Sequence, residues 1–511
     1  MRGLHLCCLL LAAGLLAFAQ DLQELQRKAS DFTLSNGLHF IVLERHESPV
    51  VSFHTWVNAG SVDDPAGQTG LARMFEHTAF NGTETIGTRN WPEEKKALDA
   101  VEEAYDRMEA EANKGIKADQ SRVDMLRSQV HIAIDNAQRL SAPGEYRRIF
   151  EENGATDLKA AVSSTSSEFF YSLPSNRVEF WFLMESQRLQ HPVLRDFYRE
   201  REAASGEYRQ RIEGNPQGKL LSEVLAAAFQ AHPYRNPSGG WPGDIGNLRR
   251  AQALAFHERY YVAGNITIAI VGDVNAAEVK RLAERYFGPM PARPMPPVTT
   301  SSEAPQYGPK TVTLERPGPP LTMVGYKRPS QYDKDDIALD LIQILLSHGR
   351  TGMLYSVLVQ EKRLALQAGA TATNPDGRYP NLFVFMLAPA QGRTVEENQR
   401  ALEDLLQRFK STPPDAQLLA RAKTQARGNM VRRMTNNSEL AHLLTVVAAN
   451  YGDWHKLFTT FDDLDQVKAE DLQRAASRYF VATGRTTVST ALPGQSGALP
   501  SAPERRTGGL Q

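Results

Sequence analysis

The chain has 511 residues, of which 41% are apolar, and it carries 58 Lys and Arg against 59 Asp and Glu. A chain of this length is too long for one compact core, so we expect two or more domains. The charge is balanced, without a basic stripe or a block of like charge, which argues against nucleic acid as a partner.

Residues 1–19 have the pattern of a secretory signal peptide. Arg2 precedes an apolar run that ends in an A-x-A-like cleavage site at 17–19. The run is short for a membrane span and no later stretch approaches eighteen apolar residues, so we expect no span in the mature chain. The pattern favours cleavage and export, to the periplasm or beyond, over a retained anchor. Cys7 and Cys8 lie in this segment, so the mature chain would have no disulfide and no thiol nucleophile.

The segment that follows predicts strands, then helices. Residues 31–60 predict three strands, because Asn36-Gly37 between apolar runs is a strong hairpin signal. Residues 68–80 predict a helix, since their apolar side chains recur at helical spacing. The highly charged stretch 91–153 has apolar residues every three or four positions, which predicts two long amphipathic helices forming a solvated hairpin.

Two features indicate that the chain consists of two similar halves. Residues 288–309 are rich in Pro, Ser and Thr, which predicts a linker. The segments 259–274 and 478–494 each have an Arg-Tyr-aromatic triplet, then a Gly-containing turn, then a β-rich run. This echo near the ends of both halves supports a duplication. Because both halves mix helices and strands, we expect an α+β class.

These patterns define a set of expected domain boundaries. The first domain is expected over 25–287, with 91–153 as a helical insertion, and the second over 310–495. The last residues, 496–511, predict a disordered tail.

The stretch GLARMFEHTAFNGT, at 70–83, is one residue short of a zinc motif. In H-x-x-E-H on a helix, two histidines one turn apart bind Zn²⁺ and the Glu polarises the bound water. Here Arg73 stands at the first position, and Glu76 and His77 complete the pattern. On its own, Glu-His on a helix is uninformative.

This stretch resembles the zinc-site helix of the pitrilysin and insulinase family, the inverted zincins, and the chain looks like a processing-peptidase-like bacterial member. The resemblance extends over most of the mature chain, including 34–72, 197–220 and 232–274. It implies two homologous α+β halves, each with a mixed or antiparallel sheet and packed helices, forming a clamshell around a peptide chamber. It also implies a zinc-dependent peptidase activity for intact members.

The family's site residues carry over position by position. His77 matches the second histidine ligand, and Glu76 matches the general base. Glu207 matches the third zinc ligand, and Glu200, seven residues earlier, matches its supporting partner. The separation of Glu207 from His77 (207 − 77 = 130) exceeds the family's usual one, and the helical insertion accounts for the excess.

The departures from the family pattern argue against a bound metal. The Arg73 guanidinium has five donors and no lone pair, so it cannot ligate zinc. The remaining pair, His77 and Glu207, is too few for a zinc site, which has three protein ligands plus water. Because Arg73 cannot bind a metal, we expect it to form an ion pair with Glu207. Three substrate-holding positions of the family are also altered, namely Lys159, Gln360 and Gln367.

Three interpretations of the function remain open. The first is a degenerate, non-catalytic member that binds peptides or pairs with a catalytically intact relative, as a heterodimer or a homodimer. The second is an active zinc peptidase with a substitute ligand, for which Glu76, Glu200 and His232 are the candidates. His232 lies in a segment that the family carries for structural reasons. The third is a structural subunit of a larger assembly.

Overall fold

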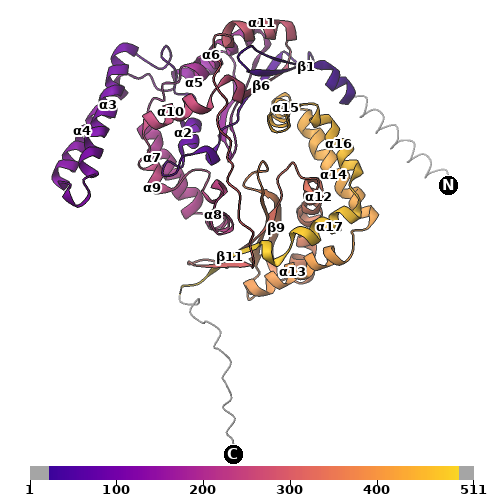
Figure 1. Cartoon of the computed structure of the whole chain (residues 1–511). Helices are drawn as coiled ribbons and strands as arrows, with labels where there is room; N and C mark the ends of the chain where they lie inside the picture. The colour runs from indigo at the N-terminus through magenta and orange to yellow at the C-terminus, as the bar shows by residue number, and fades with distance from the viewer. Residues whose placement is uncertain (1–21, 494–511) are drawn as a thin grey trace, which may run out of the picture. The chain divides into compact units, whose positions relative to one another are not determined.

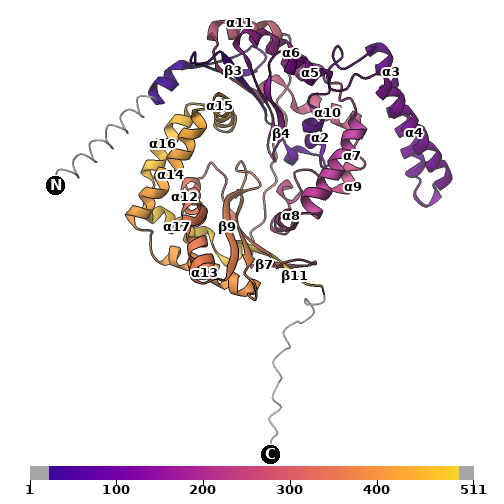
Figure 2. The same cartoon turned by 180° about the vertical axis from the view of Figure 1, so that it is seen from behind.

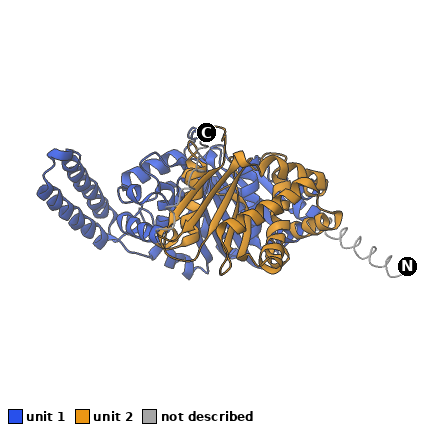
Figure 3. Cartoon of the chain, turned by 90° about the horizontal axis from the view of Figure 1, so that it is seen from below, with its two compact units in different colours: residues 1–209, 236–300, 427–463 blue, residues 210–235, 301–426, 464–511 orange. Residues whose placement is uncertain are grey.

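The computed structural model describes residues 22–493. The predicted signal peptide and the predicted tail lie outside these residues. Two compact units are shown by colour in Figure 3. Within the described residues, unit 1 comprises 22–209, 236–300 and 427–463, and unit 2 comprises 210–235, 301–426 and 464–493. Each unit therefore consists of three stretches that are separate in the sequence.

Unit 1 is built on a six-stranded mixed sheet. Its strands are β1 (Ala29–Thr33), β2 (His39–Glu44), β3 (Val50–Val57), β4 (Thr156–Val162), β5 (Ser167–Pro174) and β6 (Ile266–Gly272). Their order is β1-β2-β6-β3-β5-β4, and only the β2–β6 pair is parallel among the named strands. The three predicted strands at 31–60 are confirmed as β1 to β3. The predicted hairpin joins β1 to β2, with Gly37 at φ +95° in its turn.

Helices cover both faces of this sheet. On one face, Phe40 and Phe53 pack with Trp181 of α6 and Phe287 of α11. On the other face, Ile41 and its neighbours pack against α15, which comes from the segment 427–463 (Figure 2). The helices of unit 1 are α2 (Leu71–Thr78), α3 (Trp91–Ala112), α4 (Gln120–Leu140), α5 (Glu145–Glu152), α6 (Val178–Gln190), α7 (Phe197–Tyr208), α9 (Pro242–Ile245), α10 (Arg250–Tyr260), α11 (Ala276–Phe287) and α15 (Asn437–Tyr451).

Unit 2 contains a five-stranded sheet with its own core. Its strands are β7 (Lys310–Glu315), β8 (Thr322–Arg328), β9 (Ala365–Asn374), β10 (Asn381–Pro389) and β11 (Arg485–Ala491), in the order β7-β11-β8-β10-β9. The helices assigned to unit 2 are α8 (Pro216–Ala228), α12 (Asp336–Ser347), α13 (Val395–Ser411) and α17 (Ala469–Tyr479). Two more helices, α14 (Ala416–Met434) and α16 (Lys456–Gln466), cross from one unit's segments to the other's.

Apart from the additional edge strand β1, the two sheets have the same topology. In each, a parallel pair (β2–β6 or β7–β11) is followed by three antiparallel strands, β3-β5-β4 in one and β8-β10-β9 in the other. Chain order agrees as well, because β3 leads to α2 and β5 to α6, as β8 leads to α12 and β10 to α13. The predicted echo is confirmed, since α10 and α17 both lead through a 3₁₀ turn into β6 and β11. The α+β class with two homologous halves is therefore confirmed.

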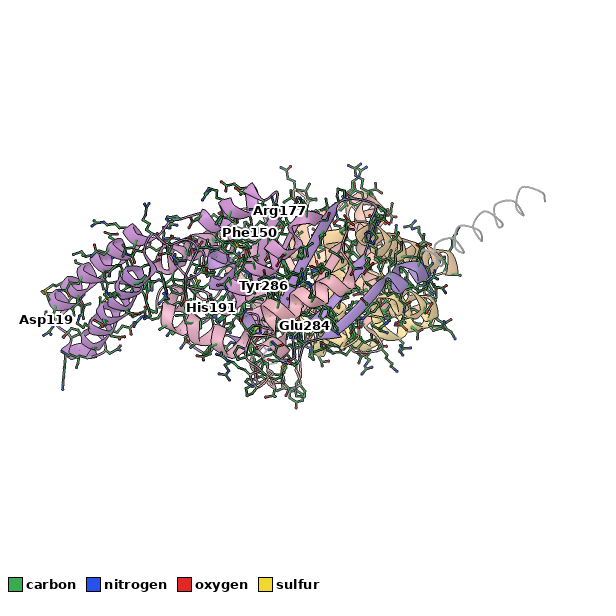
Figure 4. The ribbon with its side chains drawn as sticks, turned by 90° about the horizontal axis from the view of Figure 1, so that it is seen from above. Asp119, Phe150, Arg177, His191, Glu284 and Tyr286 are labelled. Carbon is green, nitrogen blue, oxygen red and sulfur yellow. The ribbon has the colours of Figure 1, made fainter. Side chains whose placement is uncertain are left out.

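The predicted helical insertion forms an antiparallel hairpin. α3 and α4 lie side by side, and they extend from the rest of unit 1 in both views (Figures 1 and 2). Asp119, the N-cap of α4, lies at the far end of the hairpin (Figure 4). The hairpin buries a narrow apolar seam that includes Val101, Leu126 and Val130. Its charged outer faces are those of a solvated element.

No helix among the described residues is long and apolar enough to cross a membrane. Residues 291–307, most of the predicted linker, contain no helix or strand. The expected domain boundaries stay a prediction, because compact units and homologous halves are different divisions of this chain.

Candidate active site

The helix α2 begins at a fixed point because two residues set its first turn. Gly70 has φ +100°, a left-handed conformation that favours glycine, and a Cβ there would lie 3.0 Å from the Gly239 carbonyl oxygen. The Asp64 carboxylate accepts hydrogen bonds from the Gly70 and Ala72 amides at 2.7 and 2.8 Å. Such an acceptor satisfies amides that the helix leaves free. The position of Arg73, which lies in this first turn, is fixed as a result.

Helical spacing divides α2 into two faces. Leu71, Met74 and Phe75 are buried, and Phe75 stacks on Phe256 of α10. The positions i, i+3 and i+4 place Arg73, Glu76 and His77 together on the other face. This face meets α7.

The facing helix α7 has different side chains on its two sides. Glu200 and Glu207 lie two turns apart, so they share the side toward α2. The opposite side carries Tyr198, whose hydroxyl donates to Glu102 of α3 at 2.6 Å, and Arg201, which donates to Tyr105 at 3.1 Å. The hairpin therefore lies on the side of α7 away from the site, and α2 and α7 meet despite the insertion between them in sequence.

Arg73 forms the predicted ion pair with Glu207. Its Nη2 lies 2.8 Å from both Glu207 Oε1 and Oε2, and its Nη1 pairs with Glu76 Oε2. The side chains of these residues are 12%, 24% and 23% exposed, in that order. One guanidinium thus compensates two carboxylates in a partly buried place, where unpaired charge is costly.

Glu76 is also held by the edge strand of the sheet. The Val162 amide of β4 donates to Glu76 Oε2 at 3.0 Å. Burial raises the pKa of Glu76, while Arg73 and the Val162 amide oppose this effect. Sequence analysis missed this contact, because a backbone amide gives no signal in residue identities. The Glu76 carboxylate therefore accepts hydrogen bonds from two donors, the Arg73 guanidinium and the Val162 amide.

His77 lies near Glu207 and Glu200, but its Nε2 atom forms no hydrogen bond with either of them. Its Nε2 lies 3.3 Å from Glu207 Oε2, and its Nδ1 lies 3.7 Å from Glu200 Oε2. The Nε2 atom is buried and makes no hydrogen bond within the described residues. Buried polar atoms are normally satisfied, so this orphaned nitrogen is consistent with a lost contact at the site.

Zinc does not fit the residues present at this site. The Arg73 guanidinium donates to both carboxylate oxygens of Glu207, and it has no lone pair with which to bind a metal. Among the described residues, no three imidazole or carboxylate ligand atoms converge here within 4.8 Å of one another. A protein zinc site needs at least three such ligands. The charge of the dication is replaced by a guanidinium, but its coordination chemistry is not.

The substitute ligand candidate His232 lies in unit 2. Its Nδ1 accepts from the Tyr234 amide at 3.1 Å, and its ring packs on Tyr234 and Tyr379. Burial lowers the pKa of His232 to about 4. The ring is therefore held in place and neutral, although its buried Nε2 has no hydrogen-bond partner among the described residues. Of the other candidates, Glu76 and Glu200 both lie at the site.

The three altered substrate-holding positions are not brought together within one unit. Lys159 lies on β4, at the edge of the first sheet, and pairs with Asp157 at 3.0 Å. Gln360 lies in the π-helical segment η8 (Tyr355–Glu361) of unit 2, and Gln367 lies on its edge strand β9. Their roles stay a prediction.

Comparisons with known proteins agree with this fold. Residues 40–111 match the family model described as Insulinase (Peptidase family M16), and residues 247–426 match Peptidase M16 inactive domain. The zinc protease PqqE of Helicobacter pylori is 25% identical over 466 residues, covering 90% of this chain and 92% of that protein. The crystal structure of a protease from the same organism superposes with a TM-score of 0.75 at 23% identity, covering 91% of this chain and 99% of that one.

The chain is a metallopeptidase-like protein similar to the pitrilysin/insulinase family. A more distant relative, a probable mitochondrial-processing peptidase subunit beta of Arabidopsis thaliana, is 21% identical over 465 residues and covers 88% of this chain and 75% of that protein. Family members are named zinc proteases, so zinc belongs to the family's chemistry. The match named for an inactive domain lies outside α2 and α7, so it does not bear on whether the Arg73 site is active.

Proposed function

We propose that this protein is an exported, non-catalytic member of the insulinase family that binds peptides or supports a catalytically intact relative. The observation that carries the proposal is the bidentate Arg73–Glu207 contact, with Glu76 on the same guanidinium. Peptide hydrolysis in this family needs a metal-activated water beside a free carboxylate. Here the third ligand and the general base are both engaged by Arg73.

Drift at the peptide-holding positions supports the same proposal. Lys159, Gln360 and Gln367 differ from the residues that the family places there. Loss of positioning lowers the rate of a reaction as much as loss of a catalytic group. A change confined to Arg73 would leave the rest of the machinery intact, and that is not the pattern in this chain.

A partner is proposed on the basis of the family. The Arabidopsis relative is named as a subunit, which indicates that proteins of this fold work in assemblies. The partner would be a family member with an intact H-x-x-E-H motif, and a homodimer is the alternative. Export is proposed from the signal pattern at 1–19.

The second candidate function, an active peptidase with a substitute ligand, rests on one observation. The buried Nε2 of His77 has no hydrogen-bond partner among the described residues, as expected of a ligand whose metal is missing. Movement of Arg73 would be needed to free Glu207 as well. We favour the non-catalytic function because this movement would leave two carboxylates without their cation.

Purified protein distinguishes these functions. We expect no chelator-sensitive cleavage of an unstructured peptide, and no change in bound zinc when His77→Ala is compared with the parent. An anisotropy titration with the same peptide tests binding, and co-purification from the native host tests for an intact family partner. Zinc-dependent cleavage that His77→Ala abolishes would establish the active peptidase instead.

A further inference from the structure

A second group of imidazole and carboxylate side chains lies in unit 1, on the α15 side of the sheet. We call it the His54 cluster, comprising His54 of β3, Glu168 of β5 and His442 of α15. β3 and β5 are neighbouring strands, so His54 and Glu168 project from the same face. The His54 ring stacks on Phe170 and meets the His442 ring edge-on. The Arg73 site uses none of these residues.

Three potential ligand atoms of the His54 cluster form a nearly equilateral triangle. Glu168 Oε2 lies 3.2 Å from His54 Nε2 and 3.1 Å from His442 Nδ1, and these two nitrogens are 3.3 Å apart. Tetrahedral coordination at a metal–ligand distance of about 2.0 Å requires about 3.3 Å between ligand atoms. The spacing of this triangle is therefore that of three corners of a zinc tetrahedron.

The surroundings orient the ligand atoms. The Thr445 hydroxyl has helix carbonyl acceptors at Ala441 (3.1 Å) and His442 (2.9 Å). Its oxygen can then accept the Nδ1–H of His54 at 2.6 Å, which assigns the tautomer with a lone pair on Nε2. Ser166 Oγ donates to the second oxygen of Glu168 at 2.9 Å, leaving Oε2 directed at the two imidazoles.

The charges around the His54 cluster also suit a metal. His54 is fully buried, a position that disfavours a charged imidazole. Glu168 is largely buried as well, with 11% of its side chain exposed. In the described part of the chain, the ion-pair partners of Glu168 are these two histidines, with no Lys or Arg among them. Metal binding needs neutral imidazole and ionised carboxylate.

We propose that His54 Nε2, Glu168 Oε2 and His442 Nδ1 form a zinc(II) site distinct from the Arg73 site. Two imidazoles and one carboxylate select a borderline transition metal over Ca²⁺ or Mg²⁺, which prefer all-oxygen ligands. The His442 side chain is 32% exposed, which gives the ion a route in, and water would complete the coordination. This inference does not depend on the proposed function.

The zinc site would link the segment 427–463, which contains α15, to the six-stranded sheet of unit 1. His442 lies 388 residues after His54 in sequence, and its helix packs against β3 and β6 through a buried apolar cluster. A metal that binds the folded state and not the unfolded chain stabilises the fold by mass action. Zinc should therefore raise the melting temperature by stabilising the contact of α15 with the sheet.

Titration of chelator-stripped, full-length protein with Zn²⁺ tests the site, and Co²⁺ provides a visible d–d spectrum for the same ligands. We expect one site of micromolar affinity or tighter, with tetrahedral Co²⁺ absorption and a rise in melting temperature. His442→Ala and Glu168→Gln should each weaken binding by at least about 100-fold, because each removes a ligand. Thr445→Val should weaken it by about tenfold through loss of orientation.

Two control variants separate this site from other histidines. His131→Ala changes an exposed residue of α4, and His77→Ala changes the Arg73 site, so neither should alter the titration. His442 is partly exposed, so its variant should keep the fold, which a melting curve in the presence of chelator verifies. Absent or millimolar binding in the parent, or binding lost in His77→Ala and kept in His442→Ala, would overturn the proposal.

Discussion

The Arg73 site and the His54 cluster both place imidazole and carboxylate groups together in unit 1, but they differ in what compensates the carboxylates. At the Arg73 site, a guanidinium donates to Glu207 and Glu76 and fills the position of a cation. In the His54 cluster, the ion-pair partners of Glu168 within the described residues are two histidine rings.

This difference shows that ligand-type residues alone do not define a metal site. A guanidinium supplies the charge of a metal ion without accepting a lone pair, so it stabilises the carboxylates and prevents coordination. Neutral imidazoles supply lone pairs without charge, so they leave a carboxylate ready to share a cation. The Arg73 site has the first arrangement, and the His54 cluster, which the sequence did not predict, has the second.

Replacing Arg73 with Met should give the largest stability effect. Glu76 and Glu207 would remain partly buried and would lose their shared cation, so we expect unfolding to become easier by about 2–3 kcal/mol. Urea denaturation measures this loss. Arg73→Lys keeps the charge but not the fork of donors, and it should lose less. An equal loss for both variants would mean that charge compensation is not what Arg73 provides.

Acid should abolish the contribution of Glu168 to stability. Its pKa is about 2 in the folded protein, below the value of about 4.3 for an unperturbed Glu. Protons therefore bind the unfolded chain more readily, so this stabilisation is present above about pH 4.3 and is lost as the pH falls toward 2.

Glu168→Gln isolates this effect from the other carboxylates. We expect the metal-free parent to exceed the variant by up to about 2 kcal/mol near pH 6, with the difference shrinking steadily below pH 4.3. Denaturation at a series of pH values in the presence of chelator provides the measurement. If the difference in unfolding free energy stayed constant with pH, the contribution of Glu168 to stability would not depend on its charge.

The smallest effect is expected for the coupling of Arg73 to Glu207 alone. Because both side chains retain some solvent exposure, a double-mutant cycle with Arg73→Met and Glu207→Gln should give about 1 kcal/mol. A second cycle, which combines substitutions of Arg73 and Lys159, serves as the matched control. Lys159 pairs with Asp157, so this cycle should give no coupling energy. Coupling of the same size in both cycles would indicate a general charge effect and not a specific contact.

The sequence predicted those features that reside on one element or repeat along the chain. Arg73, Glu76 and His77 lie within one helical turn, and Glu200 and Glu207 are two turns apart, so helical spacing alone defined their shared faces. The turn at Asn36-Gly37 and the echo at the ends of the halves were also local signals. The ion pair between Arg73 and Glu207 followed from combining two such faces through the family resemblance.

The His54 cluster could not be foreseen in this way. His54 and Glu168 are 114 residues apart, and His442 comes from a segment that packs into unit 1 although it lies in the second half of the chain. No periodicity relates three residues on two strands and a distant helix. Their convergence depends on the tertiary packing of α15, which propensity and spacing do not specify.

Zinc titration of Arg73→His tests the central claim that Arg73 has replaced the metal. The variant restores a third ligand beside His77 and Glu207 on two packed helices, and it is best made together with His442→Ala so that the His54 cluster does not contribute. We predict one zinc bound at least about 100-fold more tightly than by His442→Ala alone, with peptidase activity remaining weak because the peptide-holding positions also differ. Equal, tight binding by the two proteins would contradict the account, because the natural chain would then already hold a complete zinc site at His77.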